Sequence, residues 1–117
     1  MKDFRQELYE NGYFRQEELC FADCDRYQRA RVSGLLNKAA AYAGYDYDAR
    51  GLTHEMLFEM GEVFLLSRLA LRTHRIPMAG EVLDITTMEN GAKGAHMQRV
   101  YEMADRSGAV CISIKSD

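Results

Sequence analysis

The apolar residues of this sequence recur with one period in its first half and with another in its second half. Between residues 32 and 43, apolar side chains recur at spacings of three and four, which is the period of one face of an α-helix. The residues of this stripe are Val32, Leu35, Leu36, Ala39, Ala40 and Ala43. Gly44 follows the stripe and is a typical residue at the C-terminal end of a helix. The pattern therefore predicts one long helix that ends near residue 44, with mostly small residues that allow close packing on a neighbour.

From residue 62 onward the period changes to two, which is typical of half-buried strands. Tight-turn sequences such as DRSG at 105–108 separate the alternating segments, and Gly91 and Gly94 predict a break between two of them. The strands are predicted at 63–73, 81–89, 97–104 and 109–115. A first strand is expected before residue 20, and a short helix at 53–60.

This order of elements favours an α+β fold. A run of antiparallel strands with one long helix packs best when the helix lies against one face of the sheet. The small side chains along the helix suit a sheet that curls around it at close range. We therefore predict the hotdog arrangement, an antiparallel sheet wrapped around one long central helix.

Composition narrows the class of protein without changing this prediction. The chain has 117 residues, with 47% hydrophobic and 28% charged residues, so we expect a single domain over 1–117. A formal net charge of −3 argues against broad nucleic-acid binding. We find neither a signal-peptide core near the N-terminus nor an apolar run long enough to span a membrane, which predicts a cytoplasmic location. Three cysteines form no closed disulfide framework and indicate free thiols.

Three segments resemble the acyl-acyl-carrier-protein (acyl-ACP) thioesterase family. An acidic D-x-D turn at Asp23 and Asp25 precedes the long helix. A strand containing L-S-R-L-x-L, at 66–71, leads into H-R-I-P-x-x-G-E at 74–81. The next strand ends in T-T-M-E-N-G, at 86–91. Together the pieces extend the resemblance over roughly residues 15–117.

The resemblance implies more than a fold. Members of the family contain two hotdogs in one chain, and these residues resemble the first, N-terminal one. The family's catalytic Asn-x-His motif opens the helix of the second hotdog, and arginines and a tyrosine stand at the equivalent place here. The resemblance therefore implies a substrate class and an acyl-pocket role, but no catalytic residue. We expect a fragment of a longer enzyme or a naturally short relative, completed by a second hotdog or by a copy of itself in a two-fold dimer.

Thioester hydrolysis needs N–H groups that stabilise an oxyanion, and a general base that activates water. The start of the long helix, near residues 30–33, could supply the N–H groups, and Asp23 and Asp25 are candidate bases beside it. The alternative is that these aspartates cap the helix or complement its dipole. His54 opens the predicted short helix near a possible pocket mouth, but a surface or capping histidine is the alternative role.

Two further sets of side chains are candidates for substrate binding. Flexible and apolar side chains suit an adaptable acyl tunnel, although they serve equally well as ordinary core residues. The predicted lining is Leu36, Ala40, Met56, Phe58, Met60 and Phe64. Arginines suit bidentate contact with phosphate, or form a solvated surface. The candidate carrier- or phosphate-binding arginines are Arg26, Arg29, Arg31, Arg68 and Arg72.

The sequence therefore predicts an acyl-ACP thioesterase-like domain of fatty-acid biosynthesis that binds or hydrolyses fatty acyl thioesters. Its expected partners are acyl carrier protein and a second hotdog. No histidine pair has metal-ligand spacing, and we expect neither a metal nor a cofactor. The alternatives are a non-catalytic acyl-binding hotdog module and a different hotdog enzyme, such as an acyl-CoA thioesterase or a dehydratase.

Overall fold

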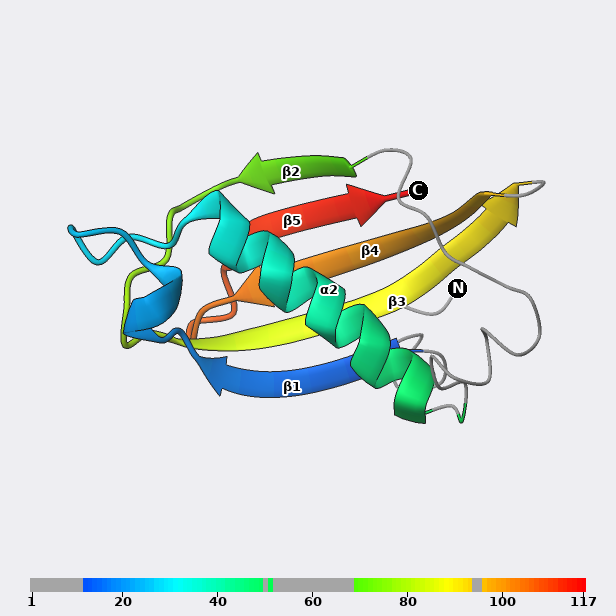
Figure 1. Ribbon diagram of the computed structural model, residues 1–117, viewed down its shortest axis with the longest axis horizontal. Helices are drawn as coiled ribbons and strands as arrows, with labels where there is room; N and C mark the ends of the chain where they lie inside the picture. The colour runs from blue at the N-terminus through cyan, green and yellow to red at the C-terminus, as the bar shows by residue number, and fades with distance from the viewer. Residues whose placement is uncertain (1–11, 50, 52–68, 94–95) are drawn as a thin grey trace.

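A computed structural model describes residues 12–49, 51, 69–93 and 96–117 (Figure 1). The described residues form five strands, one 3₁₀ turn and one long helix. In chain order these are β1 (Gly12–Glu18), η1 (Phe21–Asp23), α2 (Val32–Ala49), β2 (Leu69–Thr73), β3 (Val82–Lys93), β4 (His96–Ala104) and β5 (Val110–Ser116). The predicted short helix at 53–60 lies outside the described residues.

The five strands form one sheet in the order β1-β3-β4-β5-β2. Every neighbouring pair is antiparallel. Helix α2 lies obliquely across one face of this sheet, as Figure 1 shows. This is the predicted hotdog arrangement. Within the described part of the chain, we find no helix with the length and apolar character needed to cross a membrane.

The core lies between α2 and the sheet. Alternate side chains of the central strands are buried there, as the period of two predicted. On the sheet these are Leu83, Ile85, Tyr101, Met103, Ile112 and Ile114. Leu35 and Ala39 of α2 belong to the same buried cluster. Burying a side chain of the size of leucine or isoleucine contributes about 1.5–3 kcal/mol, so this layer holds the helix on the sheet.

The predicted end of the helix was wrong. Gly44 lies within α2, which continues for a further turn to Ala49. The predicted apolar stripe was also partly wrong, because Val32 and Ala40 are exposed.

The buried face of α2 includes polar side chains that do not belong to the predicted apolar stripe. Lys38, Tyr42 and Asp46 are buried there, at a spacing of four. Their polar atoms are paired with groups on the strands, which removes the cost of burying them unsatisfied. The same contacts explain why the helix continues past Gly44, since Asp46 belongs to its last turn.

The predicted break between two strands near Gly91 and Gly94 is shorter than expected, because β3 ends at Lys93 and β4 begins at His96. Strand β3 runs through Gly91 to Lys93, and the pairing with β4 shifts its register between Glu89 and Ala92. A glycine inside a strand often marks such a bulge, because it tolerates the irregular backbone. The glycine therefore bends the strand without ending it.

Candidate functional site

The helix begins in close contact with the turn before it. A Cβ atom placed on Gly34 would lie 2.8 Å from the backbone oxygen of Asp23 and 2.9 Å from its Cβ. Only glycine fits at this distance without a shift of the backbone. The N–H of Arg31 donates to the same Asp23 oxygen at 2.9 Å. The close approach expected from the small residues of the helix is therefore made by η1 at Gly34.

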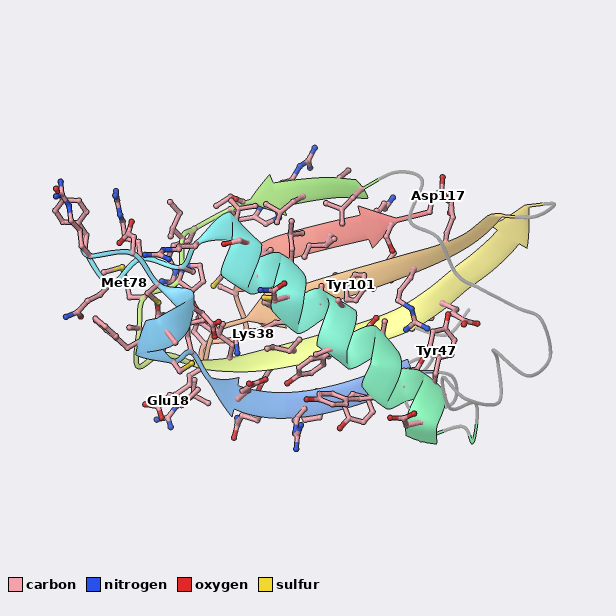
Figure 2. All side chains as sticks on the ribbon, in the orientation of Figure 1. Glu18, Lys38, Tyr47, Met78, Tyr101 and Asp117 are labelled. Atoms are coloured by element: carbon pink, nitrogen blue, oxygen red, sulfur yellow. The ribbon has the colours of Figure 1, made fainter. Side chains whose placement is uncertain are left out.

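One polar cluster lies under the N-terminal half of α2, and we call it the Lys38 cluster. Lys38 Nζ lies 2.9 Å from Glu17 Oε1 and 3.3 Å from Asp23 Oδ2. Tyr42 Oη donates to Glu17 Oε2 at 2.7 Å. Figure 2 shows Lys38 beside the end of β1 and the turn η1. The cluster thus ties the helix to β1 and to η1 through one carboxylate from each.

The protonation states of the Lys38 cluster reinforce each other. Burial acts to raise the pKa of Glu17, but the hydrogen bond from Tyr42 and the ammonium of Lys38 outweigh it and lower this pKa. Burial acts to lower the pKa of Lys38, but Glu17 and Asp23 raise it overall. Burial and the bond to Glu17 both raise the pKa of Tyr42. At neutral pH the cluster therefore holds charged lysine and glutamate beside a neutral tyrosine.

A second polar cluster, the Arg99 cluster, lies under the C-terminal half of α2. Arg99 Nη1 lies 3.0 Å from Asp46 Oδ2, and Arg99 Nη2 lies 3.3 Å from Glu89 Oε1. Arg99 also donates to Thr87 Oγ1 at 3.1 Å, and its guanidinium lies 4.8 Å from the centre of the Tyr47 ring. The side chains of Arg99 and Asp46 are only 6% and 1% exposed. This cluster is therefore a buried ion-pair network that joins α2 to β3 and β4.

The two predicted bases both take part in ion pairs. Asp23 contacts Lys38, as described above. Asp25 Oδ1 accepts hydrogen bonds from the N–H groups of Tyr27 at 2.8 Å and Arg29 at 3.1 Å. Desolvation acts to raise the pKa of Asp25, but these N–H groups and the Arg29 guanidinium lower it overall. Both contacts agree with the structural alternative, although Asp25 caps its own loop and not the helix. A catalytic role for either residue stays a prediction.

The histidines and cysteines add no catalytic arrangement among the described side chains. His54 lies outside the described residues. His74 directly follows β2, and its Nε2 lies 3.2 Å from Ser113 Oγ of β5. Cys24 is buried, and its burial and the neighbouring Asp23 carboxylate raise the pKa of its thiol. The residues that the structure describes contain no cluster of side chains able to hold a metal ion.

The H-R-I-P-x-x-G-E segment forms a rigid loop. Arg75 binds both oxygens of Glu81, at 2.6 and 3.0 Å, and also contacts Asp105 Oδ2 at 3.2 Å. Glu81 Oε2 in turn accepts the Met78 N–H at 2.5 Å. Bidentate arginine–carboxylate pairs fix geometry as well as contributing energy. The segment therefore fastens the loop before β3 to the β4–β5 turn.

The predicted acyl lining is described only in part. Leu36 is half-buried and packs against the core, and Ala40 is exposed on the helix. The other four candidates, Met56, Phe58, Met60 and Phe64, lie outside the described residues. Two surface hollows, of about 610 and 190 Å³, lie elsewhere. Neither is lined by Leu36 or Ala40, so the acyl lining stays a prediction.

The structure brings some of the candidate arginines together. Arg26, Arg29 and Arg31 are exposed in the loop that leads into α2. Arg72 is exposed on β2, which is an edge strand of the sheet. Arg68 lies outside the described residues.

Sequence reasoning missed the two polar clusters, although both leave a signal. Lys38, Tyr42 and Asp46 recur every four residues, which places them together on one helix face. Arg99 alternates with Tyr101 and Met103 on the inner face of β4. A charged residue in phase with buried residues needs a buried partner. That requirement predicts a buried acidic partner for Arg99, without showing which residue supplies it.

One long helix on a five-stranded antiparallel sheet places the chain in the class of hotdog domains. The chain is similar to a Lactobacillus plantarum protein assigned as an oleoyl thioesterase, with 27% identity and a TM-score of 0.86 over 90% of this chain and 41% of that one. It is also similar to an acyl-ACP thioesterase from Bacteroides thetaiotaomicron, with 21% identity and a TM-score of 0.84 over 92% of this chain and 44% of that one. This chain therefore spans less than half the length of these two proteins.

A shorter protein has the same fold. A 1,4-dihydroxy-2-naphthoyl-CoA thioesterase from Synechocystis matches 90% of this chain and 78% of its own length, with 12% identity and a TM-score of 0.80. We found no match among curated protein sequences.

The family model for the acyl-ACP thioesterase N-terminal domain matches residues 10–117. The chain belongs to this family.

Proposed function

We propose that this chain is the acyl-binding hotdog of an acyl-ACP thioesterase that acts in cytoplasmic fatty-acid biosynthesis. The observation that carries the proposal is the family match over residues 10–117, which covers nearly the whole chain. The fold agrees with it, because two solved thioesterases superpose on 90% and 92% of the chain.

In this proposal the domain works beside a second hotdog, supplied by further sequence or by a copy of this chain. Strand β2 supports this arrangement, since it lies at one edge of the sheet. No strand pairs with its outer side within the described part of the chain. An unpaired edge presents N–H and C=O groups that another strand can use.

The reaction proposed for the complete enzyme is hydrolysis of a fatty acyl thioester. Water adds to the carbonyl carbon, the C–S bond breaks, and the products are the free fatty acid and the carrier thiol. This hotdog would bind the acyl chain and exclude water from it, with Leu36 as a described candidate for the lining. Among the described carboxylates, Asp23 and Asp25 are already held by Lys38 and Arg29. Their pairing supports catalysis by groups of the second hotdog.

The same pairing favours one alternative, a hotdog that binds acyl groups without hydrolysing them. Equilibrium binding and hydrolysis assays distinguish the two functions when they are run on the purified protein with and without a second hotdog domain. The substrates are acyl-ACP and acyl-CoA thioesters of several chain lengths, and release of free thiol reports turnover. We expect saturable binding of acyl-ACP, with turnover only when a second hotdog is present. Absence of both binding and turnover with every thioester would contradict the proposed function.

A further inference from the structure

The loop before α2 carries an exposed arginine–tyrosine tip, formed by Arg26, Tyr27 and Arg29. Arg26 Nη2 donates to Tyr27 Oη at 2.7 Å. The guanidinium carbons of Arg26 and Arg29 lie 4.8 and 5.0 Å from the centre of the Tyr27 ring, which is a cation–π distance. Tyr27 is nevertheless 57% exposed. Figure 1 shows this loop projecting beyond the sheet at the end where α2 begins.

The backbone of the tip is held in one conformation. The side chain of Asp25 accepts two backbone N–H groups of the loop and also pairs with Arg29 Nε at 3.1 Å. The N–H of Asp25 donates to the Arg29 oxygen at 2.8 Å, and Gln28 adopts a positive φ of 66° between them. Asp25 is the nearest carboxylate in the sequence, and these contacts engage it inside the loop. Arg26 has no carboxylate partner among the described residues.

The tip is also fastened to the rigid loop of residues 74–81. The N–H of Ala30 donates to the Pro77 oxygen at 2.9 Å, and the N–H of Ala79 donates to the Gln28 oxygen at 2.8 Å. Arg29 and Met78 form an isolated β-bridge. Figure 2 places Met78 at this same end of the molecule. A surface that is ordered before binding loses less conformational entropy when a partner arrives.

The chemistry of the tip matches a protein partner with surface carboxylates. Arginine and tyrosine, together with tryptophan, are enriched at the energetic centres of protein interfaces. Two exposed apolar side chains lie in the adjoining loop, Ile76 at 47% and Met78 at 39% exposure. The formal net charge of the chain is −3, but the tip carries exposed cationic groups. These groups can attract an acidic surface of a partner.

We propose that the arginine–tyrosine tip is the docking contact for the acidic surface of an acyl carrier protein. This inference rests on the proposed function, which supplies the acyl-loaded carrier as substrate. Arg26 pairs with carrier carboxylates, and Tyr27 and Met78 supply the apolar contact beside it. The tip therefore carries out carrier recognition, whereas Arg15 on β1 lies outside the contact.

The test compares the affinity of the purified protein for two thioesters of the same fatty acid. One is carried by acyl carrier protein, and the other is the N-acetylcysteamine thioester, which has neither a protein nor a phosphate. We expect Arg26→Glu to weaken binding of the carrier thioester by at least about tenfold. Its affinity for the N-acetylcysteamine thioester should remain unchanged. Arg26→Lys should cause a smaller loss, because it keeps the charge and loses the planar fork.

The matched control is Arg15→Glu, which makes the same change of charge at another exposed arginine, on β1. It should alter carrier affinity by less than about twofold. Circular dichroism checks the fold of each variant, and Arg26→Ala is the substitute if the glutamate variant is unfolded. Apo carrier protein, which lacks phosphopantetheine, should show the same dependence on Arg26, because the contact is with carboxylates.

Four results would overturn the proposal. The first is unchanged carrier affinity in the Arg26 variants, and the second is an equal loss in the Arg15 control. The third is a loss seen only with the phosphopantetheine-bearing carrier. The fourth is binding of the N-acetylcysteamine thioester without any affinity for the carrier. The last result would leave the proposed acyl-binding function intact. Failure to bind either thioester would overturn both proposals.

Discussion

The two ends of α2 are joined to the sheet in different ways. At the N-terminal end, Gly34 brings the backbone of η1 into direct contact with the helix. The ion pairs of Lys38 there are partly solvated, with Glu17 and Asp23 side chains 37% and 24% exposed. At the C-terminal end the helix has open space beside Gly44, and a buried arginine makes the connection.

This difference separates two kinds of stabilisation. At the N-terminal end, stability depends mainly on the close fit between Gly34 and η1. The ion pairs there contribute less, because solvent partly screens their carboxylates. The C-terminal end depends on charge, because a buried guanidinium is tolerated only while its carboxylates remain in place. Substitutions that remove a charge should therefore act mainly at the C-terminal end, and substitutions that add volume mainly at the N-terminal end.

The largest effect is expected at Arg99. Arg99→Met removes the cation that faces Asp46 and Glu89 in the core. Removing one member of a buried ion pair typically costs about 3–5 kcal/mol, since the remaining charge stays desolvated. Urea denaturation of the purified protein measures the change in the free energy of unfolding.

A double-mutant cycle provides the control for this prediction. In the Arg99→Met, Asp46→Leu variant, the uncompensated carboxylate at position 46 is also removed. The double variant should lose clearly less stability than the sum of the two single variants. Additive losses would contradict the assignment of Arg99 and Asp46 as a coupled pair.

A smaller loss is expected for Gly34→Ala. The added methyl would press on the Asp23 backbone, and overpacking of this kind costs about 1–3 kcal/mol. The matched control is Gly44→Ala in the same helix, where a Cβ would meet no atom within 4 Å. That substitution should stabilise the protein by about 0.5–1 kcal/mol, because alanine loses less backbone entropy than glycine. Thermal unfolding of both variants measures the contrast, and equal effects at the two glycines would contradict it.

The smallest effect concerns the pH dependence of the Lys38 cluster. The folded pKa of Glu17 is lower than its ordinary value of 4.5, so ionised Glu17 stabilises the fold above that value. This contribution should disappear as the pH falls below 4.5 and through the lower folded pKa. Glu17→Gln should therefore cost less than about 1 kcal/mol at pH 7, and less at pH 3 than at pH 7. Unfolding curves at the two pH values measure this; an equal cost at both would exclude the ionised carboxylate as the cause.

Much of the fold follows from the sequence because its signals are local. The alternation from residue 97 to residue 103 predicts the inner face of β4, including Tyr101 and Met103. The stripe along α2 is less informative, because apolar character alone does not show that Lys38 and Asp46 have partners on distant strands. Those pairings join residues far apart in the chain. No local period contains that information.

The candidate site was less predictable than the fold. The sequence shows the arginines at 26, 29 and 31 as one cluster. It does not show that Asp25 would be engaged within the loop, which leaves Arg26 without a described carboxylate partner. The engagement of Asp25 depends on the backbone geometry of the loop, including the left-handed conformation of Gln28.

The strand order has a consequence for the synthesis of the protein. β2 is made before β3, β4 and β5, yet its only partner in the described sheet is β5. During translation β2 therefore lacks this partner while residues 74–109 are added. On the ribosome, this sheet closes only after Val110–Ser116 has left the exit tunnel and entered between β4 and β2.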